Sequence, residues 1–127
     1  MARIAITDGM AANAIKHLED SGHEVTVGFI AKDDLLAGAL ADFDAVIIRS
    51  ATKMNAAIIS ANSNLKVIGR AGVGVDNIDL LAAKEHGVMV VNAPRASTQS
   101  VIELTIGHLL TSIRHITSSN RGLRSGL

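Results

Sequence analysis

Apolar and polar residues alternate along the chain in two rhythms, one typical of buried strands and one typical of helices. Short runs such as AVII and MVV carry no polar residue, which is typical of strands covered on both faces in a parallel sheet. Between such runs, apolar residues recur at helical spacing, and Leu36 and Leu40 are expected to point inward. This order predicts an α/β fold, an open parallel sheet of about five strands with helices on both faces. The strands are expected at residues 4–7, 25–29, 45–48, 65–69 and 88–91, and the helices at residues 11–20, 33–42, 54–61 and 78–85.

The rhythm changes after residue 96, where a long C-terminal helix is expected. Apolar residues recur at positions 102, 106, 109, 110, 113 and 116, which predicts roughly five turns at about 3.6 residues per turn. Ser100 and Glu103 have the spacing of a capping box, although the helix can also begin nearer Ser97. No strand is expected after this helix, so the chain reads as cut short. We therefore predict an incomplete domain over residues 1–96 and a crossing helix with a tail over residues 97–127.

The composition argues against several classes of partner. Lys plus Arg and Asp plus Glu both number 12, so no net charge favours nucleic acid or an anionic membrane. The aromatic residues are Phe29 and Phe43 alone, which leaves no platform for base stacking. Cysteine is absent and the histidines have no ligand spacing, so neither a disulfide nor a metal site is expected. With no visible signal peptide and no apolar run of membrane length, we expect a soluble, cytoplasmic domain.

A glycine-rich bend follows the fourth expected strand, in the stretch GRAGVGVDNID at residues 69–79. A dinucleotide loop needs a third small residue and an acid at the end of the next strand, but Asn77 and Asn92 stand at these places. The bend is therefore not expected to hold a pyrophosphate. Its backbone N–H groups can hold a small anion such as a carboxylate. Alternatively, the stretch is a tight turn in which Asp76 or Asn77 caps the next helix.

Two further strand ends carry groups that can contact a ligand, because ligands of open parallel sheets bind beyond the carboxyl ends of the strands. Arg49 ends an apolar strand, and its guanidinium can pair with a carboxylate or phosphate of a ligand. It can equally form a structural ion pair with Asp8 or Asp44. Asn92 can present its amide to a ligand oxygen, or it can brace the turn into the long helix.

Three stretches together resemble one family. AVIIRSATKMN, NLKVIGRAGVGVDNIDLLAAKEHGVMVVNAP and SVIELTIGHLL are similar to the amino-terminal part of D-isomer-specific 2-hydroxyacid dehydrogenases, with the phosphoglycerate dehydrogenase type the nearest. The resemblance runs over essentially the whole chain and is densest between residues 45 and 110. It implies that the chain forms most of a flavodoxin-like substrate-binding domain, followed by the helix that crosses into a separate domain that binds NAD.

The resemblance also assigns roles to individual residues. In that family two successive backbone N–H groups in the glycine bend hold the substrate carboxylate. One departure is Ser97, which stands six residues before Glu103 where the family commonly carries an asparagine, and a serine lacks the two amide donors. The positions that match substrate-contacting residues are Arg49, Ser50, Val73, Gly74 and Asn92, and Val73 and Thr105 match positions close to the nicotinamide end of the cofactor.

In that family the dinucleotide loop and the catalytic arginine, glutamate and histidine follow the crossing helix, so no catalytic residue is expected in this chain. We expect the substrate-binding portion of an NAD-dependent enzyme acting on a small 2-hydroxy or 2-oxo acid. By itself it is expected to be inactive and to bind no cofactor tightly. The alternative is a non-enzymatic flavodoxin-like module that binds a small anion or associates with itself. The apolar stripe of the long helix favours a homo-oligomer.

Overall fold

The computed structural model describes residues 1–126. Its contacts divide the chain into two units, with the boundary in the sequence between Pro94 and Arg95. The first unit contains a parallel sheet of five strands in the order β2-β1-β3-β4-β5, which confirms the predicted fold class. Its strands are β1 (Arg3–Ile6), β2 (Glu24–Val27), β3 (Ala45–Ile48), β4 (Val67–Arg70) and β5 (Met89–Asn92). Its helices are α1 (Ala12–Asp20), α2 (Lys32–Leu36), α3 (Ala56–Ala61) and α4 (Leu80–Glu85).

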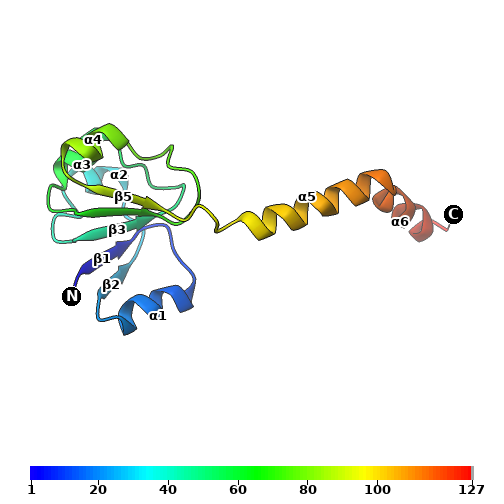
Figure 1. Cartoon of the computed structure of the whole chain (residues 1–127), viewed down its shortest axis with the longest axis horizontal. Coiled ribbons are helices and arrows are strands. Elements are labelled where there is room, and N and C mark those ends of the chain that lie inside the picture. The colour runs from blue at the N-terminus through cyan, green and yellow to red at the C-terminus, as the bar shows by residue number, and fades with distance from the viewer. Residues whose placement is uncertain (127) are drawn as a thin grey trace. The chain divides into compact units, whose positions relative to one another are not determined.

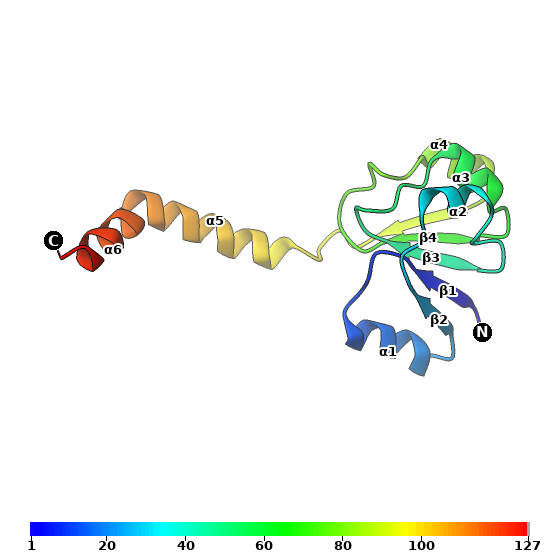
Figure 2. The same cartoon turned by 180° about the vertical axis from the view of Figure 1, so that it is seen from behind.

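The helices of this unit lie on both faces of the sheet. Figures 1 and 2 show α2, α3 and α4 over one face, and α1 on the other face beside β1 and β2. The chain passes from β1 to β2 on one side and then to β3 on the other side of β1. The strand order therefore reverses between β1 and β3, and in open α/β sheets ligands bind near such a reversal, beyond the carboxyl ends of the strands.

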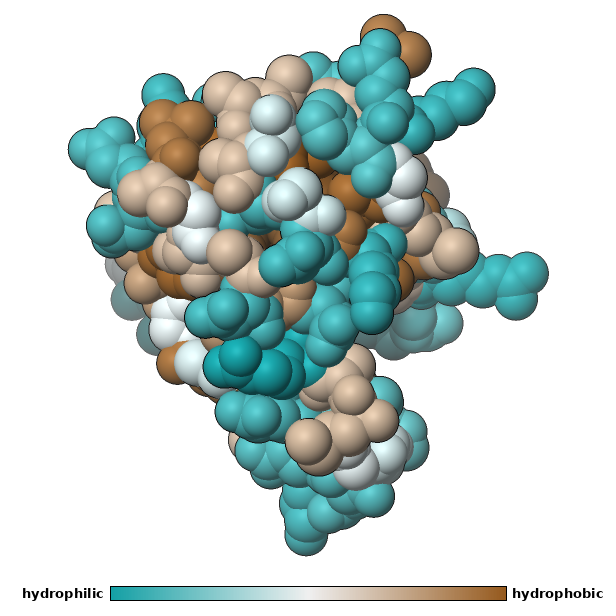
Figure 3. All heavy atoms as spheres, turned by 90° about the vertical axis from the view of Figure 1, so that its left-hand side faces the viewer, coloured by the Kyte–Doolittle hydropathy of each residue, from teal (hydrophilic) through white to brown (hydrophobic). Residues whose placement is uncertain are grey.

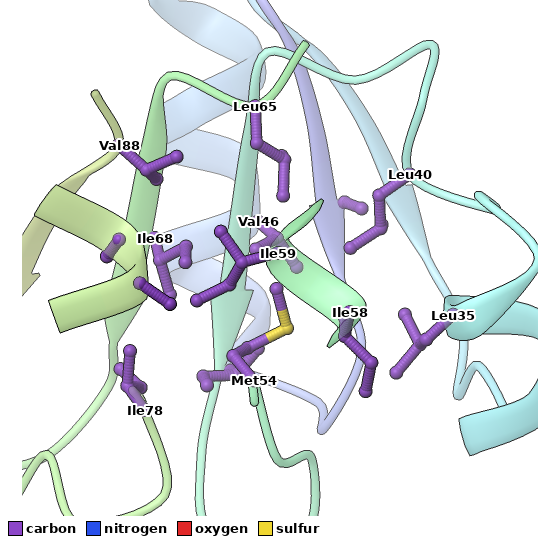
Figure 4. Packing of buried hydrophobic residues seen from close by; sticks show 14 residues of the cluster. Leu35, Leu40, Val46, Met54, Ile58, Ile59, Leu65, Ile68, Ile78 and Val88 are labelled. Atoms are coloured by element: carbon purple, nitrogen blue, oxygen red, sulfur yellow. The ribbon is translucent and has the colours of Figure 1, made fainter. Parts of the chain in front are cut away.

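The main core lies between the sheet and the helices α2, α3 and α4. Figure 4 shows Ile59 of α3 beside Val46 and Ile68 of the sheet, with Ile58 facing Leu35 of α2, and all of these side chains are buried. Burial of each such side chain contributes about 1.5–3 kcal/mol. The short helix α3 is fixed at its start, because the side chain of Asn55 accepts a hydrogen bond of 2.9 Å from the N–H of Ile58.

Helix α2 is shorter than the sequence pattern predicts. It ends at Leu36 rather than continuing to residue 42, because Gly38 adopts a left-handed conformation with φ of 90°. The shorter helix changes which leucine is inward: Leu35 is buried, while Leu36 is 39% exposed, so the prediction for Leu36 is wrong. Leu40 is fully buried, as predicted.

The face of the sheet opposite α3 is covered incompletely. Helix α1 contacts β2, whereas on β5 the side chains of Met89 and Val91 are 63% and 45% exposed. The prediction that the MVV run is covered on both faces is therefore wrong for this structure. The strand residues Ala45, Ile47, Val67, Gly69 and Val91 line an apolar trough of about 370 Å³ on this face.

Charged residues hold the amino-terminal edge of the sheet together. The Asp44 carboxylate accepts a hydrogen bond of 2.9 Å from the N–H of Arg3, and one of its oxygens lies 3.1 Å from Nζ of Lys66. The Arg3 guanidinium lies over the ring of Phe43, at 5.2 Å from its centroid. Figure 3 views the molecule from this side and shows hydrophilic side chains gathered over the surface, with apolar ones between them.

The second unit contains two helices, α5 (Thr98–Ile113) and α6 (Ile116–Arg124). Helix α5 confirms the predicted long C-terminal helix. It does not continue to the expected residue 116, because His115 adopts a left-handed conformation with φ of 52° between the two helices. The Ser100 capping box does not form either: Ser97 precedes the helix, and Glu103 accepts its hydrogen bond from Gln99. Across the part of the chain that the structure describes, every helix is too short or too polar to cross a membrane.

Candidate functional site

The loops after β3, β4 and β5 begin side by side at the carboxyl edge of the sheet. Ile48, Arg70 and Asn92 stand next to one another in the strand register. Two backbone hydrogen bonds of 2.9 Å continue this pairing into the loops. The N–H of Ala71 donates to the carbonyl oxygen of Ile48, and the N–H of Ala93 donates to that of Gly72. The structure thus gathers the main-chain positions of the predicted substrate-contacting residues of this unit along one edge: Arg49, Ser50, Val73, Gly74 and Asn92.

The glycine bend after β4 offers two free donors. Within residues 1–126, the N–H groups of Val73 and Gly74 make no hydrogen bond to the protein. A Cβ atom at Gly72 would overlap the guanidinium of Arg70, so this flexible side chain would have to move aside. The bend does not end in a cap by Asp76 or Asn77, because the helix cap is Asp79, whose side chain accepts from the N–H of Ala82 at 3.0 Å.

Arg49 has its backbone fixed and its side chain free. Its N–H donates to Oδ2 of Asp8 at 2.7 Å, while its guanidinium forms no ion pair or hydrogen bond within the described part of the chain. The alternative structural ion pair with Asp8 or Asp44 is therefore absent from residues 1–126. Asp44 pairs with Lys66 at the opposite edge of the sheet. The exposed guanidinium of Arg49 is available to an anionic ligand.

Asn92 braces the glycine bend. Its Nδ2 group donates to the carbonyl oxygen of Val73 at 2.8 Å. Of the two roles considered for this amide, the structure contains the brace. Because the carbonyl of Val73 is held in this way, the following N–H of Gly74 belongs to a peptide group whose orientation is fixed.

Asp8 accepts several hydrogen bonds at the edge of the sheet. Its carboxylate accepts from the N–H groups of Arg49 and Thr52 at 2.7 and 3.0 Å, and from the Thr52 hydroxyl. The Thr7 hydroxyl lies 3.3 Å from it. Partial burial opposes ionisation, but the hydrogen bonds from Thr52, Arg49 and Thr7 outweigh it together and hold the pKa of Asp8 below its usual value. The sequence pattern suggested Asp8 only as an ion-pair partner.

Asn77 links the two loops from the other side. Its Nδ2 group donates to the carbonyl oxygens of Arg49 and Thr52 at 2.6 and 2.7 Å. Its Oδ1 accepts from Nε of Arg70 at 3.1 Å. In the sequence this residue was notable because it replaces the third small residue of a dinucleotide loop, and as a candidate helix cap. Nothing in the spacing of the residues indicates a contact across 25 or more positions.

A hollow of about 420 Å³ lies between the two loops and is lined by Ser50, Lys53, Asp76 and Asn77 among other residues. Its volume is within the range of small-molecule sites. Asp76 places a negative charge beside the bend, since a Cβ atom at Gly74 would lie 3.2 Å from its carboxylate. This carboxylate opposes the binding of an anion at Gly74.

The second unit carries the remaining residues singled out from the sequence. Thr105 lies on α5, where its hydroxyl donates to the carbonyl oxygen of Val101 at 2.7 Å. Its role near a nicotinamide ring stays a prediction. Ser97 precedes α5, and its side chain makes no capping hydrogen bond.

Comparison with known proteins identifies relatives over nearly the whole chain. The D-3-phosphoglycerate dehydrogenase of Methanocaldococcus jannaschii is 47% identical over 127 residues, which are 99% of this chain and 24% of the relative. The hydroxypyruvate reductase of Thermotoga maritima is 42% identical over 98% of this chain and 40% of its own length.

Solved structures agree with these relatives. The NAD⁺-bound 3-phosphoglycerate dehydrogenase of Entamoeba histolytica superposes with a TM-score of 0.73 at 36% identity, over 87% of this chain and 38% of that one. The chain thus spans about a quarter to two-fifths of the length of these relatives. The family model of the D-isomer specific 2-hydroxyacid dehydrogenase catalytic domain matches residues 4–123. The chain belongs to the D-isomer specific 2-hydroxyacid dehydrogenase family.

Proposed function

We propose that this chain is the substrate-binding portion of an NAD-dependent D-2-hydroxyacid dehydrogenase of the phosphoglycerate dehydrogenase type. In the whole enzyme, hydride would pass between C2 of the substrate and NAD. The observation that carries the proposal is the pair of unbonded N–H groups of Val73 and Gly74, on a braced bend at the same edge as the free guanidinium of Arg49. Adjacent N–H donors of this kind bind a carboxylate.

The two kinds of donor suit a substrate with two anionic groups. The N–H groups of the bend would hold the carboxylate next to C2, and Ser50 would contribute a hydroxyl to the same loop edge. The guanidinium of Arg49 forms planar, paired hydrogen bonds with a phosphate or a second carboxylate. A phosphorylated hydroxy acid meets both requirements, and the relative from Methanocaldococcus jannaschii is named for such a substrate.

The bend is a poor site for the cofactor itself, and we propose that NAD binds mainly to a separate domain. A dinucleotide loop opens a helix at its third small residue. Here Asn77 stands at that place, and its side chain is already bonded to Arg49, Thr52 and Arg70. Val73 and Thr105 would contact the nicotinamide end alone. The 127-residue chain is accordingly expected to reduce no NAD.

The proposal is tested by titrating the ¹⁵N-labelled chain with D-3-phosphoglycerate, D-glycerate and NAD. D-3-phosphoglycerate should shift the amide signals of Val73 and Gly74 in a saturable manner. Arg49→Met should weaken the binding of D-3-phosphoglycerate by about tenfold, the factor that corresponds to about 1.4 kcal/mol. The affinity for D-glycerate should be nearly unchanged. The matched control is Arg121→Met, which replaces an exposed arginine on α6 and should leave the affinity for both ligands unchanged.

Two results would contradict the proposal. One is saturable binding of NAD to the glycine bend with the affinity of a dinucleotide site. The other is a D-3-phosphoglycerate titration in which Val73 and Gly74 remain unshifted while signals elsewhere move.

A second candidate function is a non-enzymatic module that associates with itself. It is favoured by helix α5, on which Ile102, Ile106, Leu109, Leu110 and Ile113 are each about half exposed. This candidate and the first differ in the ligand titration, because self-association alone does not require free N–H groups at the bend.

A further inference from the structure

The loop at residues 49–52, directly after β3, is held by side chains that lie outside it. We propose that Asp8 and Asn77 are positioning residues for the anion site: together they fix the backbone of this loop, so that the side chain of Arg49 and the groups of Ser50 face a ligand without further ordering. The inference rests on the proposed function, because it concerns the same site. Neither residue is expected to touch the substrate.

Asp8 holds the N–H groups of the loop. It follows β1, and its carboxylate receives the N–H groups at both ends of the loop, from Arg49 and from Thr52. The Thr52 hydroxyl donates to the same carboxylate and lies 2.9 Å from the hydroxyl of Thr7. Thr7 and Thr52 are both buried, so the base of this network is shielded from water.

Asn77 holds the carbonyl groups of the same two residues. Its Nδ2 group donates to Arg49 and Thr52 at 2.6 and 2.7 Å. Arg70 donates to its Oδ1 and thereby orients the amide. The main-chain polar groups of Arg49 and Thr52 are thus occupied, the N–H groups by Asp8 and the carbonyls by Asn77. In contrast, the N–H groups of Ser50 and Ala51 make no hydrogen bond within residues 1–126.

This division of the loop is what an anion site requires. The ends of the loop are fixed by residues far away in the sequence, and the middle of the loop keeps its donors free. A loop ordered in advance loses less conformational entropy when a ligand binds, so affinity rises without any added contact. Asn77 also joins this loop to the glycine bend, because Asn77 and the N–H groups of Val73 and Gly74 belong to one short segment.

Asp44 offers a matched comparison. It too is an aspartate that accepts a backbone N–H and joins two segments of the sheet, but it lies at the amino-terminal edge, away from the site. If such bonds serve stability alone, loss of Asp8 and loss of Asp44 should have the same kind of effect. If Asp8 positions the loop, its loss alone should change ligand affinity.

The experiment measures the Kd of D-3-phosphoglycerate by amide titration of the 127-residue chain and of the variants Asp8→Asn, Asn77→Leu and Asp44→Asn, well below their unfolding temperatures. Asp8→Asn removes a negative charge close to an anion site, so electrostatics alone would tighten binding. Positioning predicts the opposite sign, a loss of about tenfold or more. Asn77→Leu, which changes no charge, should show a similar loss, and Asp44→Asn should bind like the unsubstituted chain.

A second pair of variants guards against loss of folding. Thr52→Val removes the hydroxyl that bonds to Asp8, and Thr52→Ser keeps it. We expect weaker binding for the valine variant and recovery in the serine variant. The ¹⁵N relaxation of Ser50 and Ala51 without ligand should report a rigid loop in the unsubstituted chain and a mobile one in Asp8→Asn and Asn77→Leu.

The outcomes separate this inference from the proposed function. Equal or tighter binding by Asp8→Asn, or a loop equally rigid in all variants, would overturn the positioning role. Absence of D-3-phosphoglycerate binding to the unsubstituted chain would defeat the proposed function instead, and the relaxation measurement would still decide whether Asp8 and Asn77 order the loop.

Discussion

Asp8 and Asp44 hold backbone N–H groups at opposite edges of the sheet, and both carboxyl groups have a lowered pKa. For Asp8, partial burial raises the pKa, but the hydrogen bonds from Thr52, Arg49 and Thr7 together lower it further. For Asp44, the N–H of Arg3 and the ammonium of Lys66 lower the pKa. A carboxyl group with a lowered pKa stabilises the fold when it is ionised.

This lowering predicts how acid affects stability. The contribution of Asp8 should be complete above its ordinary pKa of 3.8 and should be lost as the pH falls from there through the lower value in the folded state. At neutral pH, Asp8→Asn should reduce the free energy of unfolding by about 1–3 kcal/mol, because an NH₂ group replaces one accepting oxygen. Urea unfolding at neutral pH and at about pH 3 measures the difference, which should shrink in acid. A difference independent of pH would show that the charge of Asp8 is not what stabilises the loop.

At the scale of elements, the residue pattern located all five strands with both ends within two residues, because β-branched runs have few alternatives to a buried sheet. Helix ends were less predictable. Helix α2 stops where Gly38 takes a positive φ, and α5 stops near His115, although neither glycine nor proline stands at that break. Such conformations depend on surroundings that a residue pattern does not contain.

Two glycines of different elements should respond oppositely to alanine. At Gly69 in β4, a Cβ atom would make ordinary contacts with Ile47 and Val91 at 3.6 and 3.8 Å, so Gly69→Ala should raise the free energy of unfolding by about 0.5–1 kcal/mol. At Gly87, after α4, φ is +68°, so Gly87→Ala should lower the free energy of unfolding by about 1–2 kcal/mol. Urea denaturation compares them. Destabilisation by Gly69→Ala would mean that the apolar trough, which Gly69 and Val91 both line, cannot accept a methyl group.

At the scale of the whole molecule, each unit leaves an apolar surface exposed. In the first unit it is the trough beside β5, and in the second it is helix α5, whose residues Val101 and Leu104 are 56% and 62% exposed in addition to the stripe at 102, 106, 109, 110 and 113. A helix with apolar residues on several faces is typical of a buried position.

We therefore expect the 127-residue chain to associate with a second copy through α5. Light scattering at increasing concentration should show a dimer or a larger assembly. Leu109→Glu should shift the equilibrium towards the monomer, since it places a charge in the stripe. Ser112→Glu adds the same charge to the same helix at a polar position and should have little effect. A monomer at every concentration would contradict this expectation.

The sequence by itself determined the parallel α/β sheet, the family and the strand ends that form the candidate site, because local periodicity and motif order are properties of neighbouring residues. Tertiary structure alone decided what these strand ends do. In the folded chain, Asp8 accepts the N–H groups of Arg49 and Thr52, which lie 41 and 44 positions further along. Asn77 joins two loops, Asn92 braces the glycine bend, and the guanidinium of Arg49 is free within the described residues. Hydrogen bonds between distant segments depend on how the fold brings those segments together, and the local residue pattern does not show which segments will be neighbours.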